Sequence, residues 1–368
     1  MKKRKDGRYQ RRFTVSGIHC VVMGRNKAEL DAKEYKKRQE IESGRATREN
    51  PTLDEYFNKW IDAKRGTAKD ATLFNYTRTY GVMSRMELPN TGKKLGAMRL
   101  KEVLPDDIRA LQSEMAKTLN TNTINERLSL LSCIFYGAIE ERRIDFNPCK
   151  PVKALKRKEK TARETVHRAL TKQEVDAFMS KAKDSYYYDV YRLALATGLR
   201  VGEIGALTNR DIHDGFIWVN KTITKAETGG KIIGDTPKSK SGIRKIPLND
   251  DIRRILEHQK SMNALLYGNV VSMDSLIFRS FTGGFINDVG IIRNMRKLCK
   301  EAGVEYFTMH AFRATFATRC IECGINPKTV QSLLGHSNFN ITMSLYGHTH
   351  DDTKIEAMET LQRYANMG

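Results

Sequence analysis

The stretch from His310 to His348 reads HAFRATFATRCIECGINPKTVQSLLGHSNFNITMSLYGH, and three motifs within it carry side chains capable of chemistry. HAFR separates His310 and Arg313 by three residues, so both side chains lie on one face of a helix. LLGHSN supplies His336, and SLYGH supplies Tyr346. Taken singly, each motif also has an ordinary explanation as a helix surface, a loop or a packed aromatic ring. Their combination is what indicates a site.

Two motifs further upstream supply more side chains capable of chemistry. TGLRVGEI contains Arg200 and Glu203, and KSKSGIRKIPL contains Lys240. Two arginines, a lysine, two histidines and a tyrosine suit attack on a phosphodiester. Guanidinium groups pair with non-bridging oxygens, lysine or histidine moves protons, and a phenol can act as a covalent nucleophile. No carboxylate cluster of the metal-holding kind accompanies these residues in the sequence, which argues against a two-metal nuclease.

Charge and composition indicate a polyanionic partner inside the cell. The 368-residue chain has a formal net charge of +21 and an isoelectric point near 9.7, which favours nucleic acid as partner, although charge also keeps a protein soluble. No apolar run approaches the roughly 20 residues that cross a bilayer, so we expect no membrane partner. The basic N-terminus lacks the apolar segment of a secretory signal, and the six cysteines are scattered. We therefore expect a cytoplasmic protein.

Residues 1–50 form a small basic region, with fifteen Lys and Arg against seven Asp and Glu. The sequence predicts strands over 8–15 and 19–23, followed by a helix over 27–42. A small α+β domain of this kind can lay a basic sheet into a DNA groove. A solubilising appendage without a ligand is the alternative interpretation.

Residues 51–150 change to a helical pattern. Thr52 is a plausible N-cap, and the apolar residues that follow it recur on one helical face. Further helices are predicted over 71–86, 105–119 and 122–143, which together make an all-α bundle. A basic linker is predicted over 151–168 and suits a protein that closes around a duplex, although a merely solvated linker has the same composition.

Residues 169–368 predict a mixed, mainly α domain with a small antiparallel sheet. Helices are expected early in this region, again after 250, and over 351–365 near the end. The predicted boundaries are helices over 171–183 and 186–196, a helix from Arg200, and strands over 216–219, 221–225, 231–233 and 244–247.

The ordered series Arg, Lys, HxxR, GH and Tyr resembles the tyrosine recombinase (phage integrase) family. The match spans about 169–348, and the spacing of its last motifs is similar to that of integrases from phages and conjugative transposons of Gram-positive bacteria. The regions 1–50 and 51–150 resemble the arm-binding and core-binding domains of that subgroup. The resemblance therefore implies a multidomain site-specific DNA recombinase that integrates and excises a mobile element.

The resemblance also implies a role for each motif residue. Arg200 and Arg313 would clamp the scissile phosphate. His310 would act as a general base or as a hydrogen-bond donor to that phosphate, His336 would donate to a phosphate oxygen, and Tyr346 would form a 3′-phosphotyrosine bond.

Two supporting roles follow from the same resemblance. Lys240 would lie in the loop of a β-hairpin and protonate the leaving 5′ oxygen. Its seven-residue distance to Pro247 fits the family pattern better than that of Lys238. Glu203 would orient its neighbours.

The resemblance further implies the cofactors and partners. A phosphotyrosine bond conserves the energy of the broken phosphodiester, so neither a nucleotide nor a metal is expected. Double-stranded DNA would bind at core and arm sites. A homo-tetramer would assemble on DNA by exchange of the C-terminal helix, for which intramolecular packing is the alternative. An excision factor and a host DNA-bending protein would be accessory partners.

Three other functions share parts of this pattern. A type IB topoisomerase would relax supercoils without a defined site. A chromosome-dimer resolving recombinase normally lacks a region such as 1–50. A non-catalytic DNA-binding protein would have lost one of the six motif positions, and all six are filled here.

Overall fold

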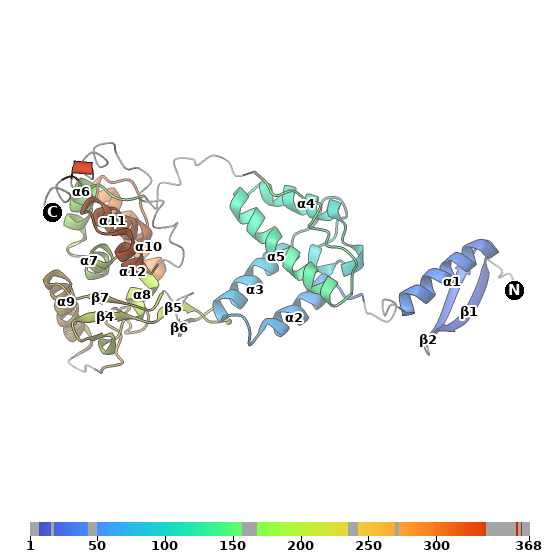
Figure 1. The fold of residues 1–368 in the computed structure, drawn as a ribbon, viewed down its shortest axis with the longest axis horizontal. Coiled ribbons are helices and arrows are strands. Elements are labelled where there is room, and N and C mark those ends of the chain that lie inside the picture. The colour runs from blue at the N-terminus through green and yellow to red at the C-terminus, as the bar shows by residue number, and fades with distance from the viewer. Residues whose placement is uncertain are drawn as a thin grey trace. The chain divides into compact units, whose positions relative to one another are not determined.

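The structure, a computed structural model, describes most of the chain. The described residues are 7–15, 18–42, 50–156, 168–234, 242–268 and 272–335, together with Met358, Glu359 and Gln362. The chain divides into two compact units, residues 1–159 and 160–368. Figure 1 labels their elements, and each unit is described by itself below.

The chain begins with an antiparallel hairpin and one helix. Strands β1 (Tyr9–Val15) and β2 (Ile18–Gly24) pair in register from Tyr9 opposite Gly24 to Val15 opposite Ile18, and α1 (Lys27–Glu42) follows. Strand alternation places Val15 and Cys20 in a small core with Ile41 of α1. The same alternation leaves Arg12 and other side chains of the opposite face exposed. The sheet therefore has one face covered by the helix and one face open.

Residues 50–156 form a helical bundle around an apolar core. Its helices are α2 (Leu53–Lys64), α3 (Asp70–Ser84), α4 (Pro105–Ala116) and α5 (Thr121–Glu140), with short 3₁₀ turns η1 (Leu95–Ala97) and η2 (Leu100–Glu102). The largest side chains of the core include Tyr56, Phe57, Tyr80 and Phe135.

Local caps explain where these helices begin. The Thr52 hydroxyl accepts a hydrogen bond from the Glu55 N–H at 3.2 Å, and the Glu55 carboxylate accepts one from the Thr52 N–H at 2.7 Å. Pro105 occupies the first turn of α4, and Asn120 caps α5 through the Thr123 N–H at 2.9 Å. These signals lie in the sequence itself, which is why the predicted helix starts fall within two residues of the observed ones.

The first residues after the bundle fold back onto it. The Asn125 side chain both donates to the Leu155 carbonyl and accepts from the Leu155 N–H, each at 3.0 Å. Val152 and Leu155 pack against the bundle core. Residues 151–156 are thus held by α5, whereas 157–167 of the expected linker lie outside the described residues.

The second unit is mixed, with helices around small sheets. Its helices are α6 (Lys172–Ala182), α7 (Tyr188–Thr197), α8 (Val201–Ala206), α9 (Asp250–Tyr267), α10 (Asp288–Ala302), α11 (Met309–Glu322) and α12 (Pro327–Leu334), with the 3₁₀ turn η4 (Asn209–Asp211). Its strands are β3 (Ile212–His213), β4 (Phe216–Val219), β5 (Thr222–Lys225), β6 (Lys231–Gly234) and β7 (Arg244–Pro247).

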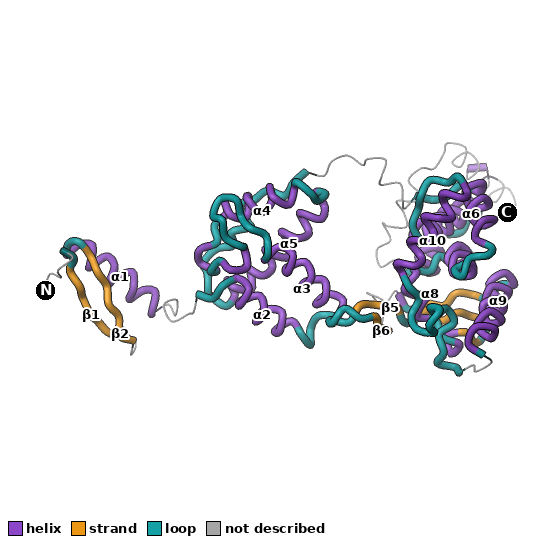
Figure 2. Tube along the Cα trace, turned by 180° about the vertical axis from the view of Figure 1, so that it is seen from behind, coloured by secondary structure: helices purple, strands orange, loops and turns teal. Residues whose placement is uncertain are grey.

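These strands form two antiparallel sheets, ordered β3-β4-β7 and β5-β6. Figure 2 shows strands as a minor part of a mainly helical chain. The core of the unit gathers Phe178, Tyr191 and Phe312 from the helices, Phe307 from the loop before α11 and Ile217 from β4. The chain is therefore multidomain and mostly helical, with small antiparallel sheets.

The described strands on either side of Lys240 do not pair with each other, and Lys240 with the hairpin expected around it lies outside the described residues. Strand β6 pairs with β5, whereas β7 pairs with β4, so the strands on either side of 235–241 belong to different sheets. The reason is burial. Ile246 of β7 lies opposite Ile217 of β4, and both are buried in the same core.

Among the described residues, no helix is long and apolar enough to cross a membrane. The helix expected over 351–365 falls almost wholly outside the described part of the chain.

Candidate active site

A tight turn between α7 and α8 positions Arg200. Helix α7 ends on Gly198, whose φ of 65° is left-handed and whose N–H donates to the Ala194 carbonyl at 2.9 Å. A Cβ on Gly198 would lie 2.6 Å from the Phe316 ring and 2.8 Å from the Leu334 side chain. Glycine is thus required here both by the backbone and by the close packing. Two residues later Arg200 starts α8.

Glu203 holds Arg200 in place from inside the protein. Its carboxylate accepts hydrogen bonds from the Arg200 backbone N–H and from Arg200 Nη1, each at 2.9 Å. The Glu203 side chain is 2% exposed, whereas that of Arg200 is 40% exposed. Burial by itself raises the pKa of Glu203, but the hydrogen bond and charge of Arg244, with those of Arg200, hold that pKa below its ordinary value. Glu203 is therefore an anionic anchor behind a partly exposed guanidinium.

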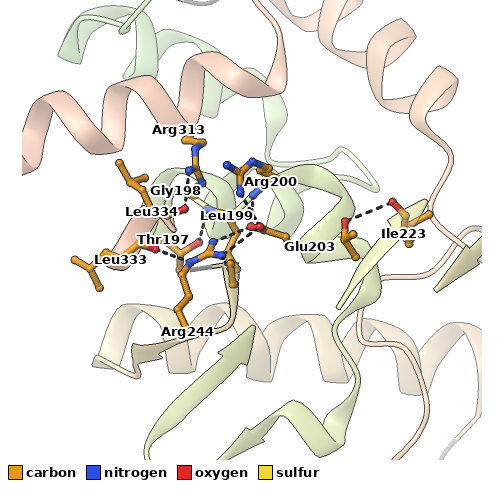
Figure 3. A network of polar contacts seen from close by, with 12 residues as sticks. Thr197, Gly198, Leu199, Arg200, Glu203, Ile223, Arg244, Arg313, Leu333 and Leu334 are labelled. Carbon is orange, nitrogen blue, oxygen red and sulfur yellow. Dashed lines mark hydrogen bonds and ion pairs between the residues drawn. The ribbon is translucent and has the colours of Figure 1, made fainter. Parts of the chain in front are cut away.

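Arg313 reaches the same place from α11. Its Nη1 donates to the Gly198 carbonyl at 2.8 Å, and its Nη2 donates to the Leu334 carbonyl at 2.6 Å. Burial, followed by the positive charge of Arg200, lowers the pKa of Arg313 to about 9, so the group is still charged at neutral pH. The two bonds use only part of the donor set of a guanidinium fork. Arg313 thus joins the α7–α8 turn to the end of α12, as Figure 3 shows.

His310, Arg200 and Arg313 line one cavity of about 280 Å³. His310 lies one turn before Arg313 on α11 and is exposed, in agreement with the helical face that the HAFR motif predicts. Two guanidinium groups and an imidazole facing one small open cavity form a site for a tetrahedral oxyanion, because each can donate charge-assisted hydrogen bonds.

Strand β5 forms the wall of this cavity next to α8. A Cβ on Gly202 would lie 2.7 Å from the Thr222 hydroxyl, and one on Gly205 would lie 2.6 Å from the Ile223 side chain. The two glycines of VGEIG therefore allow α8 to pack directly against β5. Asp288 at the start of α10 also lines the cavity, and it pairs with Lys231 at 3.2 Å.

The structure brings together Arg200, Glu203, His310 and Arg313. The other expected site residues, Lys240, His336 and Tyr346, lie outside the described residues. The described stretch 272–335 ends next to His336, at Gly335, which caps α12 with a φ of 67°. Among the described residues, no cluster of three His, Cys, Asp or Glu could hold a metal ion.

Arg244 is a further residue of the site, and none of the expected roles included it. Its guanidinium lies behind Arg200 and donates to both carboxylate oxygens of Glu203, at 2.8 and 3.2 Å. The segment KSKSGIRKIPL does contain a signal for Arg244. Side chains along β7 are alternately buried and exposed, and Arg244 is buried on the same face as Ile246. An arginine at an inward strand position needs a buried partner.

The sequence and the fold of the chain match those of known proteins. The model of the phage integrase family matches residues 168–353. A tyrosine recombinase described as XerC-like, from Caldanaerobacter subterraneus subsp. tengcongensis, is 27% identical over 365 residues, covering 94% of this chain and 91% of that protein.

Solved structures agree with the family match. The integrase of transposon Tn1549, in complex with a circular intermediate DNA, matches with a TM-score of 0.68 and 26% identity over 84% of this chain and 99% of that chain. A lambda integrase tetramer bound to a Holliday junction shares the fold, with a TM-score of 0.59 and 23% identity over 95% of this chain and 96% of that chain. The chain belongs to the phage integrase family, and it is a tyrosine-type site-specific DNA recombinase.

Proposed function

We propose that the cavity lined by Arg200, His310 and Arg313 binds the scissile phosphate of a DNA strand. The observation that carries this proposal is the convergence of these three side chains, from α8 and α11, on one small cavity. Arg200 and Arg313 pair with the non-bridging oxygens and stabilise the charge that grows as the phosphorus becomes five-coordinate. Because Arg313 and Glu203 are buried and hydrogen-bonded, the clamp is arranged before DNA arrives.

The nucleophile in this proposal is Tyr346. Its phenol oxygen attacks the phosphorus and loses its proton, with His310 as the base or as a donor to the phosphate. The bond from phosphorus to the 5′ oxygen breaks, and Lys240 protonates that oxygen while His336 donates to a non-bridging oxygen. The product is a 3′-phosphotyrosine and a free 5′ hydroxyl. Attack by a 5′ hydroxyl of a second strand reverses the step and joins the strands.

The proposed reaction needs no external energy source. One phosphate ester replaces another, so the free energy of the phosphodiester is kept in the protein–DNA bond. Fixed cationic side chains supply the electrostatic stabilisation, so the proposal includes no cofactor.

The remaining domains would select and assemble the DNA. The open face of the β1–β2 sheet, with the exposed Arg12, suits an arm site, because a two-stranded ribbon fits the major groove. The bundle of 50–156 would bind the core site, and the basic linker would let the two units close around it. Lambda integrase, whose fold this chain shares, forms a tetramer on a Holliday junction. We extend that assembly to this chain, with exchange of the C-terminal helix between protomers and with an excision factor and a host DNA-bending protein as accessory partners.

A covalent-trap experiment tests the nucleophile. A core duplex from the ends of the mobile element carries a nick beside the cleavage position, so that a short strand diffuses away after cleavage. Wild-type protein accumulates as a covalent adduct on a denaturing gel, and Tyr346→Phe binds the duplex without forming the adduct. Tyr306→Phe is the matched control, because it makes the same chemical change in a tyrosine that packs at the edge of the core of the second unit. An adduct formed by Tyr346→Phe would show that another residue attacks.

The XerC-like relative, which matches 94% of this chain, raises a second candidate function, the resolution of chromosome dimers. Recombination between plasmid-borne copies of the host's dimer-resolution site, in preference to the ends of a mobile element, would favour it. We expect the opposite preference, because the β1–β2–α1 region supplies a basic domain for an additional DNA site.

A further inference from the structure

Arg244 is a buried arginine that bonds to two distant segments of the second unit and to the backbone just before its own strand. Its side chain is 4% exposed. It bonds to Glu203 of α8, its Nε donates to the Leu333 carbonyl at 2.7 Å, and its Nη1 donates to the Gly242 carbonyl at 3.1 Å. Figure 3 shows its guanidinium between the end of α12 and Glu203.

The segments that Arg244 joins are those that carry the proposed phosphate ligands. Glu203 bonds directly to Arg200. Leu333 precedes Leu334, whose carbonyl accepts from Arg313, and in the sequence these residues lead to His336. Gly242 follows Lys240 by two residues in the sequence. Arg244 itself does not line the cavity.

Apolar packing would not explain an arginine at this position. A buried ion pair contributes little net stability, since both charges lose their hydration, and hydrophobic residues of similar volume often replace such pairs without loss. A guanidinium provides directional hydrogen bonds, which hydrophobic residues cannot. Its planar fork gives several directional hydrogen bonds at fixed angles. Here these bonds connect residues that are 41 and 89 positions apart in the sequence.

The last turn of α12 is bonded by both buried arginines. The carbonyls at a helix C-terminus lack partners within the helix. Arg244 takes that of Leu333, and Arg313 takes that of Leu334. Two cations at the negative end of the helix also favour its dipole. The end of α12 is therefore held from two sides by guanidinium groups.

We propose that Arg244 is a positioning residue for phosphate binding, which holds Arg200 through Glu203 and aligns the end of α12 with it. The proposal rests on the proposed function of Arg200 and Arg313. In this proposal Arg244 does not contact DNA. It positions Arg200 and the end of α12, which carry the groups that contact it.

The experiment is a double-mutant cycle of Arg244→Lys with Arg200→Lys, read as single-turnover cleavage of the nicked duplex. Lysine keeps the charge opposite Glu203 but cannot reach Glu203, Leu333 and Gly242 together. We expect Arg244→Lys to slow cleavage by about 10²-fold, the size of loss that a small misplacement causes. The dissociation constant for the duplex should change by less than about threefold, since loss of positioning affects chemistry more than binding. In the Arg200→Lys background, the further loss should stay below about tenfold, because the two residues act as a unit.

Arg210→Lys is the matched control. Arg210 makes a two-pronged ion pair with Asp274, at 2.8 and 3.1 Å, on the surface of the same unit. The Arg210→Lys variant should cleave at the wild-type rate. If Arg244→Lys does not fold, as judged by its melting transition, the combined variant Glu203→Gln with Arg244→Gln removes both charges of this buried ion pair together, so neither is left without the other. That variant should fold and cleave slowly.

The outcomes separate this proposal from the proposed function. Suppose that Arg200→Lys cleaves slowly while Arg244→Lys, or the variant with both Glu203→Gln and Arg244→Gln, cleaves at the wild-type rate. That result overturns the positioning role of Arg244 and leaves the phosphate clamp intact. Fully additive losses overturn the positioning role as well, since they show that Arg244 does not act through Arg200. Wild-type cleavage by Arg200→Lys overturns the phosphate clamp, and with it the positioning role.

Discussion

The bundle of 50–156 and the site around Arg200 are both helical, but they use buried charge differently. In the bundle, the buried Asp107 accepts from the Leu104 N–H at 2.8 Å, three residues away, and so completes a local cap. At the site, Arg313 bonds to a carbonyl 115 residues away. Buried charge closes a helix start in both regions, since Glu203 also accepts from the Arg200 N–H, but the bonds of Asp107 reach 17 residues along the chain whereas those of Arg313 reach 115.

This difference shows what each region tolerates. Apolar contacts, which dominate the bundle core, are non-directional, so the core keeps its fold when one contact is weakened. Hydrogen bonds from a guanidinium weaken steeply with misalignment. The site is therefore well ordered only while every contributing segment is in place, and small changes there should affect chemistry before they affect the fold.

The largest expected effect follows from Arg313→Lys. An ammonium cannot serve the Gly198 carbonyl, the Leu334 carbonyl and a phosphate together, so cleavage should fall by about 10²–10³-fold, as when one transition-state donor is removed. Single-turnover cleavage with saturating protein measures this loss. Arg293→Lys, an exposed change on α10, should cleave normally. A normal rate for Arg313→Lys would show that the site does not depend on directional bonds.

The next expected effect is a loss of stability in Gly198→Ala, measured by urea denaturation. The left-handed backbone costs an alanine about 1–2 kcal/mol. The contacts with Phe316 and Leu334 add about 1–3 kcal/mol of overpacking. Gly303→Ala is the control, because Gly303 has a similar φ of 67° with open space around its Cβ position. Equal losses in the two variants would mean that the α7–α8 turn is not tightly packed against α11 and α12.

The smallest effect should come from the bundle. Thr52→Ala removes the hydroxyl that caps α2 and should lower the free energy of unfolding by about 1 kcal/mol. Thr52→Ser keeps the hydroxyl and should retain most of that stability. Cleavage of bound DNA should be unchanged in both, because the bundle packs through apolar contacts that survive the loss of one cap. A large loss of cleavage in Thr52→Ala would remove the contrast between the two regions.

Elements with local signals could be predicted closely. The helix predicted over 27–42 is α1, and the strands predicted over 216–219 and 244–247 are β4 and β7. Capping residues, glycine stops and alternation are properties of neighbouring residues, so they can be read without the fold. Strand β3 was missed, because two residues are too few to show alternation.

Pairings between distant segments could not be predicted in the same way. The strands on either side of Lys240 do not pair with each other, because burial of Ile217 and Ile246 joins β4 to β7 while β6 pairs with β5. Arg244 was missed for a related reason. Its partners lie on α8 and α12, and nothing near it in the sequence identifies them.

The amino-acid sequence by itself determined the helical and strand periods, the caps and the order of the motif residues, since each depends on spacing over a few positions. Only the tertiary structure decided that Arg200, His310 and Arg313 share a cavity and that Arg244 and Glu203 stand behind it. The physical reason is that hydrogen bonds across 41 to 115 residues require α7, α8, α11 and α12 to be held together by apolar packing.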